Sequence, residues 1–346
     1  MQFAMKQALE LARSARGTTL PNPVVAAMVW DRHGKLIGQG ITQPPGGKHA
    51  EVLALEMAGR HAEGGTMVVT LEPCVAFPGK RTPPCSGKVL QAGIGTLVVG
   101  CIDPNPQVAG KGVRALKLAG LDVKEEGLSG KVREFYGGFA HHMATGLPRV
   151  TLKIASSRDG MATATAGTAT KITGPKSKAF VHRLRADSDW ILIGKGTLLS
   201  DDPRLDVREC PGRSPHRLVL WSGELPDRTF QLFCGGPTSF AGCGKRPACL
   251  PETVEWIDLE PTGDVLAQLL QALGQRGVHD LLVEPGPGLL RSFLTKGCWD
   301  RLWWLQSPDD LPGGVSFDPE GLLPQTACRT QMLGDDRARL FENRQS

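Results

Sequence analysis

The sequence predicts an α/β protein built from two domains. Buried-strand patterns, such as residues 24–30 and 190–193, alternate with helical patterns in both halves of the chain. Such alternation is typical of a largely parallel sheet covered by helices. A chain of 346 residues is long enough for two hydrophobic cores. Gly146-Leu147-Pro148 reads as a linker, so we expect domains at residues 1–146 and 150–346.

Composition narrows the class of protein. With 40% apolar and 22% charged residues, the chain is ordinary for a globular protein. Its longest apolar run, residues 24–30, is too short to span a bilayer, and residues 1–16 resemble a first helix and not a signal peptide. Nine cysteines without a regular framework favour the reducing cytoplasm. A net charge of +5 suits a small anionic substrate, and no basic block interleaved with aromatics predicts nucleic-acid binding.

The first half begins with an amphipathic helix that Gly17 ends, followed by the rigid turn Pro21-Asn22-Pro23. After this turn the pattern predicts strands at 24–30, 35–41, 67–71, 96–101 and 121–124, and helices at 49–62, 85–93 and 112–119.

Three short motifs in this half predict a metal site. They are His49-Ala50-Glu51, Pro73-Cys74 and Pro84-Cys85. One imidazole and two thiolates give three ligands of a tetrahedral zinc ion and leave a fourth position open for water. Glu51 is placed to move that water's proton without binding the metal. The pattern is typical of zinc-dependent nucleobase deaminases.

Two other interpretations of these motifs fit the sequence less well. A structural zinc site would need a fourth Cys or His ligand, but His61, the nearest further histidine, falls twelve residues along the same predicted helix. A deaminase acting on DNA or tRNA would need a basic groove and usually a C-x-x-C spacing, which the chain lacks.

The second half repeats the strand–helix pattern. We expect strands at 151–155, 190–193, 217–221 and 281–284 and helices at 176–186 and 265–274. Residues 161–167, almost all Ala and Thr, are expected to form a flexible or close-packed loop, and Gly194 and Gly196, which follow a strand, could form only a tight turn. Cys234, Cys243 and Cys249 could form a second metal site, but no fourth ligand lies nearby in the sequence.

With these residues in view, nearly the whole chain resembles the bifunctional deaminase/reductase family of riboflavin biosynthesis. The first half matches in PNP (21–23), HAE (49–51), TLEPC (70–74), RTPPC (81–85) and DPNPQVAGKG (103–112). The second half matches in LK (152–153), SRDG (157–160), LRADSD (184–189), GKGTLLSDDPRLDVR (194–208) and LLVEPGPG (281–288). The resemblance implies a cytidine-deaminase-like three-layer αβα domain followed by a dihydrofolate-reductase-like α/β domain.

The resemblance also implies the reactions and the roles of matching residues. A zinc-dependent domain would deaminate a small phosphorylated pyrimidine, and an NADPH-dependent domain would reduce its ribosyl side chain. Zinc would be held by His49, Cys74 and Cys85, with Glu51 as proton donor. The implied cofactor positions are Ala155, Lys171, Thr197, Asp201, Ser222, Gly286, Pro287 and Gly288. The implied substrate positions are Asn22, Ala169, Arg185, Leu205, Arg208 and Glu284.

The chain departs from the family pattern mainly in its second half. Ala169 and Lys171 stand where the family tends to have serine and tryptophan, Pro285 replaces a small residue, and Trp221 replaces an aspartate. In the first half, Thr42 replaces a common histidine. The loop between Cys74 and Cys85 is about two residues longer than usual and lacks a Ser-His pair.

Three hypotheses follow. The first is a bifunctional riboflavin-pathway enzyme, the second an active deaminase with a weakened or non-catalytic reductase domain, and the third a non-catalytic relative with a scaffolding domain. We also expect a cytoplasmic homo-oligomer that binds neither nucleic acid nor membrane.

Overall fold

The computed structural model describes residues 2–78, 82–125, 129–163, 170–226, 228–311, 313–316, 320–323 and 327–343. Ala169, expected at a substrate position, lies outside the described residues. The chain divides into two compact units, Met1–Gly146 and Leu147–Ser346. Each unit is described by itself.

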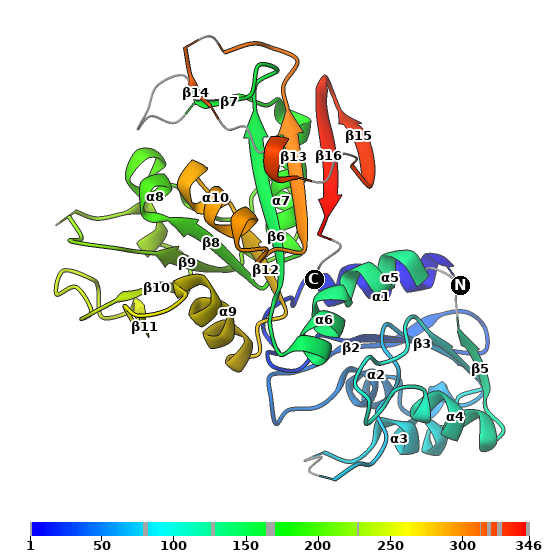
Figure 1. Ribbon diagram of the computed structural model, residues 1–346. Helices are drawn as coiled ribbons and strands as arrows, with labels where there is room; N and C mark the ends of the chain where they lie inside the picture. The colour runs from blue at the N-terminus through cyan, green and yellow to red at the C-terminus, as the bar shows by residue number, and fades with distance from the viewer. Residues whose placement is uncertain are drawn as a thin grey trace. The chain divides into compact units, whose positions relative to one another are not determined.

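The first unit contains a five-stranded sheet in the order β2-β1-β3-β4-β5 (Figure 1). Its strands are β1 (Ala26–Trp30), β2 (Leu36–Ile41), β3 (Thr66–Val69), β4 (Thr96–Val99) and β5 (Asp122–Glu125). β1 pairs antiparallel with both β2 and β3, while β3, β4 and β5 are parallel. β3, β4 and β5 form the parallel part that the strand–helix alternation predicted, and the hairpin turn expected at residues 31–34 joins β1 to β2, so β1 is the strand of this sheet that runs opposite to the others.

Helices cover both faces of this sheet, which makes three layers (Figure 1). Alternate residues of β1 face opposite sides: Ala27 and Val29 join one core, while Ala26 and Met28 join the other. The first core holds α2 (Ala50–Ala58), α3 (Cys85–Gln91) and α4 (Lys111–Leu118), and the second holds α1 (Gln2–Arg13), α5 (Ser129–Phe135) and α6 (Gly137–Thr145). A 3₁₀ turn, Gly59–Ala62, ends α2 earlier than the expected helix over 49–62.

Small residues let α2 approach β2 closely. A Cβ atom on Gly38 would lie 2.2 Å from the backbone oxygen of Ala54, and one on Gly40 would lie 2.4 Å from that of Ala50. No larger side chain fits at either position without moving the helix. These contacts fix the distance between the sheet and α2, the helix that carries Glu51.

The second unit contains a nine-stranded sheet in the order β11-β10-β9-β8-β12-β6-β13-β16-β15. The strands from β11 to β13 are parallel, and β16 and β15 add an antiparallel edge. Their bounds are β6 (Arg149–Ser156), β8 (Trp190–Gly194), β9 (His216–Leu220), β10 (Thr238–Cys243), β11 (Glu255–Leu259), β12 (Asp280–Val283), β13 (Arg301–Gln306), β15 (Arg329–Leu333) and β16 (Asp336–Glu342).

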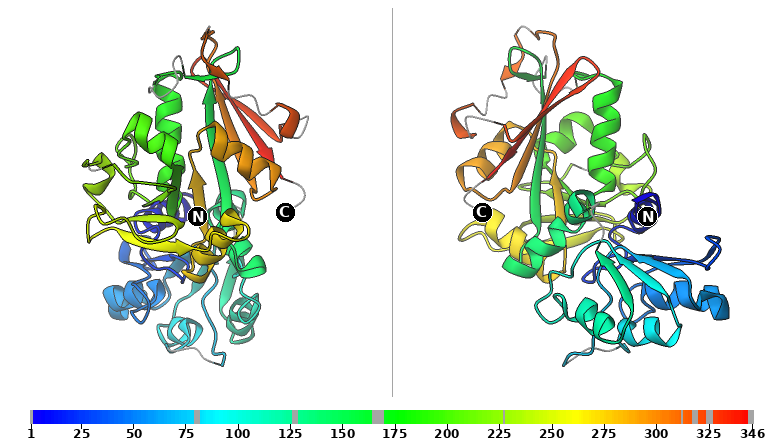
Figure 2. Two further views of the ribbon diagram at one scale, coloured as in Figure 1. Left: turned by 60° about the vertical axis from the view of Figure 1, so that its left-hand side comes forward. Right: turned by 90° about the vertical axis from the view of Figure 1, so that its right-hand side faces the viewer.

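Helices lie on both faces of this sheet as well. Figure 2 shows α7 (Pro175–Ala186) on one side and α9 (Val265–Gln275) and α10 (Pro287–Thr295) on the other. The seven-residue α8 (Lys195–Asp201) follows β8 directly. Short 3₁₀ turns occupy Gln231–Phe233 and Glu320–Leu322.

Two local features of this unit differ from the simplest interpretation of the sequence. Gly194 and Gly196 form more than a tight turn, because Gly194 caps α8 and the helix begins at Lys195. Part of the expected Ala/Thr loop is a strand, since β7 (Met161–Thr163) pairs antiparallel with β14 (Val315–Ser316).

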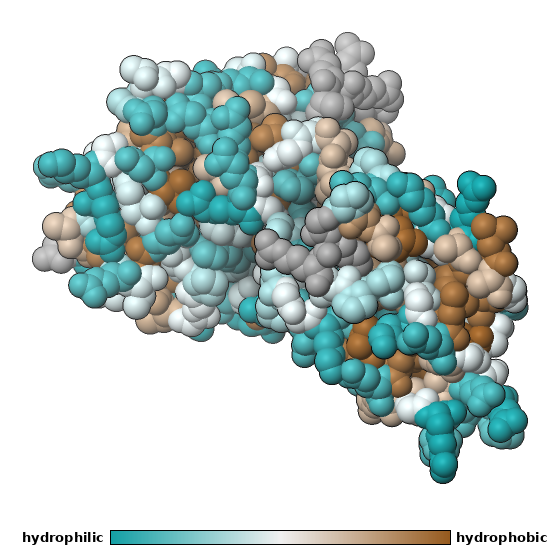
Figure 3. All heavy atoms as spheres, turned by 90° about the horizontal axis from the view of Figure 1, so that it is seen from below, coloured by the Kyte–Doolittle hydropathy of each residue, from teal (hydrophilic) through white to brown (hydrophobic). Residues whose placement is uncertain are grey.

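Among the described residues, no helix is long and apolar enough to cross a membrane. Figure 3 shows apolar residues on the surface in patches between hydrophilic ones. The most exposed large apolar side chains that the structure describes are Phe3, Met57, Leu118 and Met332.

Candidate active sites

The three expected metal ligands meet in the first unit. His49 immediately precedes α2, Cys74 follows β3, and Cys85 is the first residue of α3. His49 Nδ1 lies 3.6 Å from Cys74 Sγ and 3.4 Å from Cys85 Sγ. Three side chains from different elements, 36 residues apart at most, therefore aim their ligand atoms at one point.

The spacing of these atoms fits zinc. Bond lengths of about 2.0–2.1 Å to nitrogen and about 2.3 Å to sulfur place tetrahedral nitrogen and sulfur ligands about 3.6 Å apart. The backbone N–H of Cys85 donates to Cys74 Sγ at 3.4 Å, which favours the metal-binding thiolate form. Thr82 Oγ1 lies 3.3 Å from His49 Nε2 and helps to hold the ring with Nδ1 toward the cysteines.

Glu51 lies beside this cluster on the first turn of α2. Its side chain is buried, with only 3% of the residue exposed. Burial raises the pKa of Glu51 to about 7, and the negative charge of a Cys74 thiolate adds to this shift. A hydrogen bond with Cys85 acts in the opposite direction and shows that the carboxyl group reaches the ligands.

A second buried acid, Glu72, fixes the segment that carries Cys74. Its carboxylate accepts hydrogen bonds from the backbone N–H groups of Gly110 at 2.8 Å and Val113 at 3.0 Å. It also accepts one from Asp103 N at 3.2 Å. The start of α4 thus packs against Pro73, so closely that a Cβ atom on Gly112 would lie 2.1 Å from the Pro73 oxygen.

Asp103 is a residue near this site that the sequence did not assign. Burial raises its pKa to about 6, and the charges of Glu72 and Cys74 contribute. Only its place in the matched stretch 103–112 could have pointed to it. Asn22, the expected pyrimidine contact, lies exposed in the turn before β1, and its side-chain amide makes no hydrogen bond to another described residue.

The second unit contains a cavity of about 1100 Å³ at the carboxyl ends of its parallel strands. Among the expected positions, those that line it are Ala155, Lys171, Arg185, Thr197, Asp201, Arg208, Glu284, Gly286, Pro287 and Gly288. Ser222 and Leu205 do not line it. Leu205 has a positive φ of 53° and packs into the hydrophobic core, so only its backbone could face a substrate.

A buried charge cluster forms one wall of this cavity. Arg185 donates to Glu284 through Nε at 2.7 Å and Nη2 at 3.0 Å, and Lys153 Nζ lies 3.4 Å from the same carboxylate. Burial alone would raise the pKa of Glu284, but the two cations lower it to about 2. The sequence did not assign Lys153, which lies on the less buried face of the alternating strand β6.

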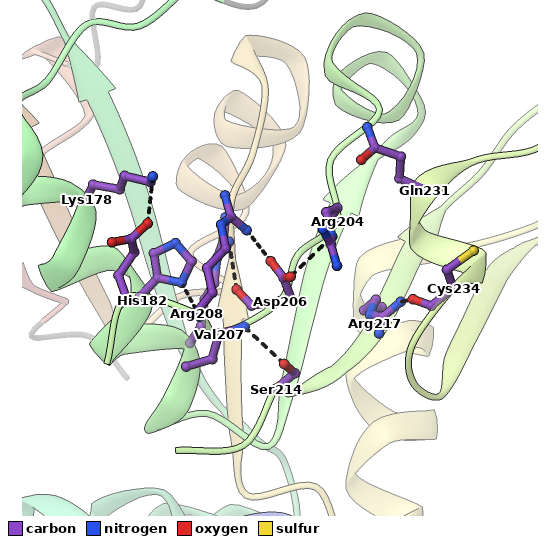
Figure 4. A network of polar contacts seen from close by, with 12 residues as sticks. Lys178, His182, Arg204, Asp206, Val207, Arg208, Ser214, Arg217, Gln231 and Cys234 are labelled. Atoms are coloured by element: carbon purple, nitrogen blue, oxygen red, sulfur yellow. Dashed lines mark hydrogen bonds and ion pairs between the residues drawn. The ribbon is translucent and has the colours of Figure 1, made fainter. Parts of the chain in front are cut away.

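Arg185 and Arg208 differ in how accessible their guanidinium groups are to a ligand. Arg185 also donates Nη1 to the backbone oxygen of Asp206 at 3.1 Å, so the protein itself engages its guanidinium. Arg208 pairs with the Asp206 side chain, and its backbone N–H donates to His182 Nδ1 at 3.2 Å (Figure 4). With 46% of its side chain exposed, Arg208 remains accessible to an anion.

Another part of the cavity lining suits a dinucleotide. Gly286 caps α10, and a Cβ atom there would lie 3.3 Å from Thr197 Oγ1, so the backbone of this loop lies against α8. A helix N-terminus with a glycine cap favours phosphate groups. Cavities for single small ligands measure about 300–1,000 Å³, so this cavity has room for a cofactor beside a substrate.

Fold and site together define a zinc-binding deaminase domain joined to a reductase domain. Residues 1–101 match the cytidine and deoxycytidylate deaminase zinc-binding region, and residues 148–333 match the RibD C-terminal domain.

Whole-chain relatives identify the family. The chain is 35% identical to the riboflavin biosynthesis protein RibD of Aquifex aeolicus, over 98% of this chain and 97% of that protein. For RibD of Escherichia coli the identity is 37% over 87% of this chain and 86% of that protein. A solved structure of Acinetobacter baumannii RibD is similar with a TM-score of 0.79 and 33% identity, covering 99% of this chain and 98% of that one.

The chain therefore belongs to the RibD family of bifunctional deaminase/reductases in riboflavin biosynthesis. It is an enzyme with a zinc-binding deaminase domain and an NADPH-using reductase domain, as the sequence resemblance predicted. In RibD enzymes the substrate is a small phosphorylated pyrimidine.

Proposed function

We propose that the first unit hydrolyses the 2-amino group of 2,5-diamino-6-(5-phosphoribosylamino)pyrimidin-4-one. The second unit then reduces the ribosyl side chain of the product to ribityl with NADPH. The observation that carries this proposal is the open triangle of His49, Cys74 and Cys85 with a buried carboxyl group at its edge. The solved Thermotoga maritima structure whose title names this deaminase and reductase supports it, with a TM-score of 0.80 and 29% identity over 98% of this chain.

In the deaminase, water adds to the ring carbon and ammonia leaves, so the water gives up two protons, one to a ring nitrogen and one to the departing amino group. Glu51 is the group placed to carry these protons, because its carboxyl contacts Cys85 and is shielded from solvent. Zinc held by His49, Cys74 and Cys85 would supply a water acidic enough to attack near neutral pH. Asn22 would orient the pyrimidine through its available amide.

In the reductase, NADPH would supply the hydride. Arg208 would pair with the substrate phosphate, because a guanidinium binds phosphate as a fork and this one is accessible. Arg185 would act on Glu284, holding its carboxylate in place with two hydrogen bonds. Of the expected cofactor positions, Ala155, Thr197, Asp201 and residues 286–288 would lie along the cofactor, because they line the cavity.

A variant of the deaminase site separates the two activities. Glu51→Gln keeps the shape of the site but cannot carry a proton, so ammonia release should fall by about 10²–10⁴-fold or more. The same variant should still oxidise NADPH when supplied with the deaminated substrate. Glu56→Gln on the exposed side of α2 is the matched control. Ammonia release from Glu51→Gln close to that of wild type would refute the role of Glu51.

A weakened reductase is the second candidate, favoured by two observations. Lys171 lines the cavity where the family tends to have a flat tryptophan, and prolines at 285 and 287 remove two backbone N–H donors near the start of α10. Ala169→Ser with Lys171→Trp should then raise the rate of NADPH-dependent reduction. An unchanged rate in this double variant would argue for a fully adapted reductase.

A cytoplasmic location and a homo-oligomeric state remain parts of this proposal. Gel filtration with light scattering of the purified chain would measure the second directly.

A further inference from the structure

Most cations of the reductase cavity already have an acidic partner. Lys153 and Arg185 pair with Glu284, Lys178 pairs with Glu209, and Arg208 pairs with Asp206. Among the described residues that line the cavity, two lysines have no carboxylate within ion-pair distance, Lys171 and Lys195.

Lys195 is held in a defined place. It is the first residue of α8 and follows directly on β8. Its ammonium group lies 4.9 Å from the centre of the Trp221 ring and donates to the Ser222 carbonyl oxygen at 2.7 Å. A lysine ammonium has three N–H donors, so two remain for a ligand. The positive charge therefore lies where the carboxyl ends of β8 and β9 adjoin.

The position of this charge matters for a dinucleotide. In parallel α/β sheets, phosphates bind where a helix begins, and the adenosine ribose extends toward the end of the neighbouring strand. A carboxylate there binds the ribose hydroxyls of NAD, whereas a cation accommodates the 2′-phosphate of NADP. Here the residue after β9 is Trp221, no acid follows before Glu224, and Lys195 supplies a cation.

We propose that Lys195 binds the 2′-phosphate of the cofactor and sets the preference of this enzyme for NADPH over NADH. The inference rests on the cofactor cleft proposed above, between α8 and α10. Trp221 contributes by holding the Lys195 ammonium beside the cleft through a cation–π contact, and the ammonium keeps N–H donors for a ligand.

The test measures dissociation constants by calorimetry for NADPH and NADH with the full-length protein. Lys195→Gln should weaken NADPH binding by about 10- to 100-fold, because a hydrogen-bonded charge pair is lost. NADH binding should change by less than about twofold, since NADH has no 2′-phosphate to lose. Lys195→Arg should retain the preference. Lys296→Gln, which removes a charge paired with Asp264 away from the cavity, is the control.

Two smaller ligands isolate the contribution of the adenosine end of the cofactor from that of its nicotinamide end. 2′,5′-ADP should bind wild type more tightly than 5′-AMP, and Lys195→Gln should remove that difference. An equal loss of NADPH and NADH binding in Lys195→Gln would overturn the proposal, because it would indicate only a packing role. So would a preference lost in Lys171→Gln and kept in Lys195→Gln. Failure of the wild-type protein to bind either dinucleotide would contradict the proposed cofactor cleft itself.

Discussion

At the scale of single residues, the metal ligands come from separate elements, and a backbone hydrogen bond from Cys85 to Cys74 Sγ links two of them. His49 depends on α2, Cys74 on the end of β3 and Cys85 on the start of α3. Removing one thiolate should therefore leave the other two ligand atoms in place while lowering affinity strongly.

Cys85→Ala should lose most of its zinc, and the wild-type chain should carry one zinc per subunit. Three protein ligands are the minimum for a catalytic zinc site, and two are too few to retain the ion through purification. Metal analysis of the purified proteins measures this. Cys101→Ala, a half-buried cysteine outside the cluster, is the control. An equal zinc content in Cys85→Ala and wild type would refute the assignment of Cys85 as a zinc ligand.

A second residue-scale prediction concerns His216 in the reductase unit. Its ring stacks on Trp190 with centroids 3.7 Å apart, and Nε2 lies 2.7 Å from Ser239 Oγ. Burial lowers the pKa of His216 to about 4, and Arg217 contributes to the shift. Because the unfolded chain binds a proton near pH 6.5, stability should be fully present above that pH and be lost as the pH falls toward 4.

The effect should reach up to about 3 kcal/mol, the free energy that corresponds to this pKa shift. Urea unfolding at several pH values would measure it. His216→Gln can still bond Ser239 but cannot titrate, so its stability should depend less on pH across this window. Parallel pH profiles for the two proteins would contradict the prediction.

At the scale of elements, close backbone contacts position the deaminase site. The carboxylate of Glu72 joins the end of β3 to the start of α4, and Gly112 allows the two to touch. A methyl group at Gly112 must push α4 away from Pro73, next to a metal ligand.

Gly112→Ala should therefore destabilise the protein by about 2 kcal/mol or more and lower its zinc affinity, because overpacking costs about 1–3 kcal/mol and Glu72 would lose hydrogen bonds. Gly87→Ala is the matched control: it lies in α3, and its added Cβ would meet nothing within 4 Å. The control should gain up to about 1 kcal/mol from helix propensity. Chemical denaturation and competition with a chelator provide the two measurements.

The sequence predicted the elements with strong hydrophobic patterns and missed those without them. β8 and α9 fall within a residue or two of their expected bounds, because an apolar strand and an amphipathic helix are visible locally. β10 was missed because Thr238–Cys243 contains no β-branched aliphatic residue and is buried by its neighbours. α8 was missed because its two early glycines, one of them the cap, resemble a turn.

The same division holds for the sites. The zinc motif was predictable because metal chemistry demands particular residues at recognisable spacings. The resemblance brought Arg185 and Glu284 to one site, but their mutual hydrogen bonds and the contribution of Lys153 were not predicted, because nothing local indicates that residues 99 apart share a hydrogen bond. The side chain of Leu205 packs into the core, so its expected role at a substrate position would rest on its backbone.

At the scale of the whole molecule, each unit has its own sheet and hydrophobic cores. Ligands of one unit should therefore stabilise that unit alone. Calorimetry should show a transition that NADPH raises and another that a zinc chelator lowers.

NADPH at about 100 times its dissociation constant adds about 2.7 kcal/mol to one transition, or about 5–10 °C for a unit of this size. Adenosine alone at the same concentration is the control ligand. A single transition that both treatments shift would show that the two units unfold as one.

The contact of Gly112 with Pro73 also bears on the unusual length of the loop between the two cysteine ligands. Cys74 is fixed by α4 and Cys85 by α3, so the ten residues between them do not set the distance between the sulfur atoms. The free energy of loop closure rises only as the logarithm of loop length, so an increase from eight residues to ten costs about 0.2 kcal/mol. This segment can therefore gain or lose residues, and so reshape the surroundings of the substrate, while the metal site keeps its dimensions.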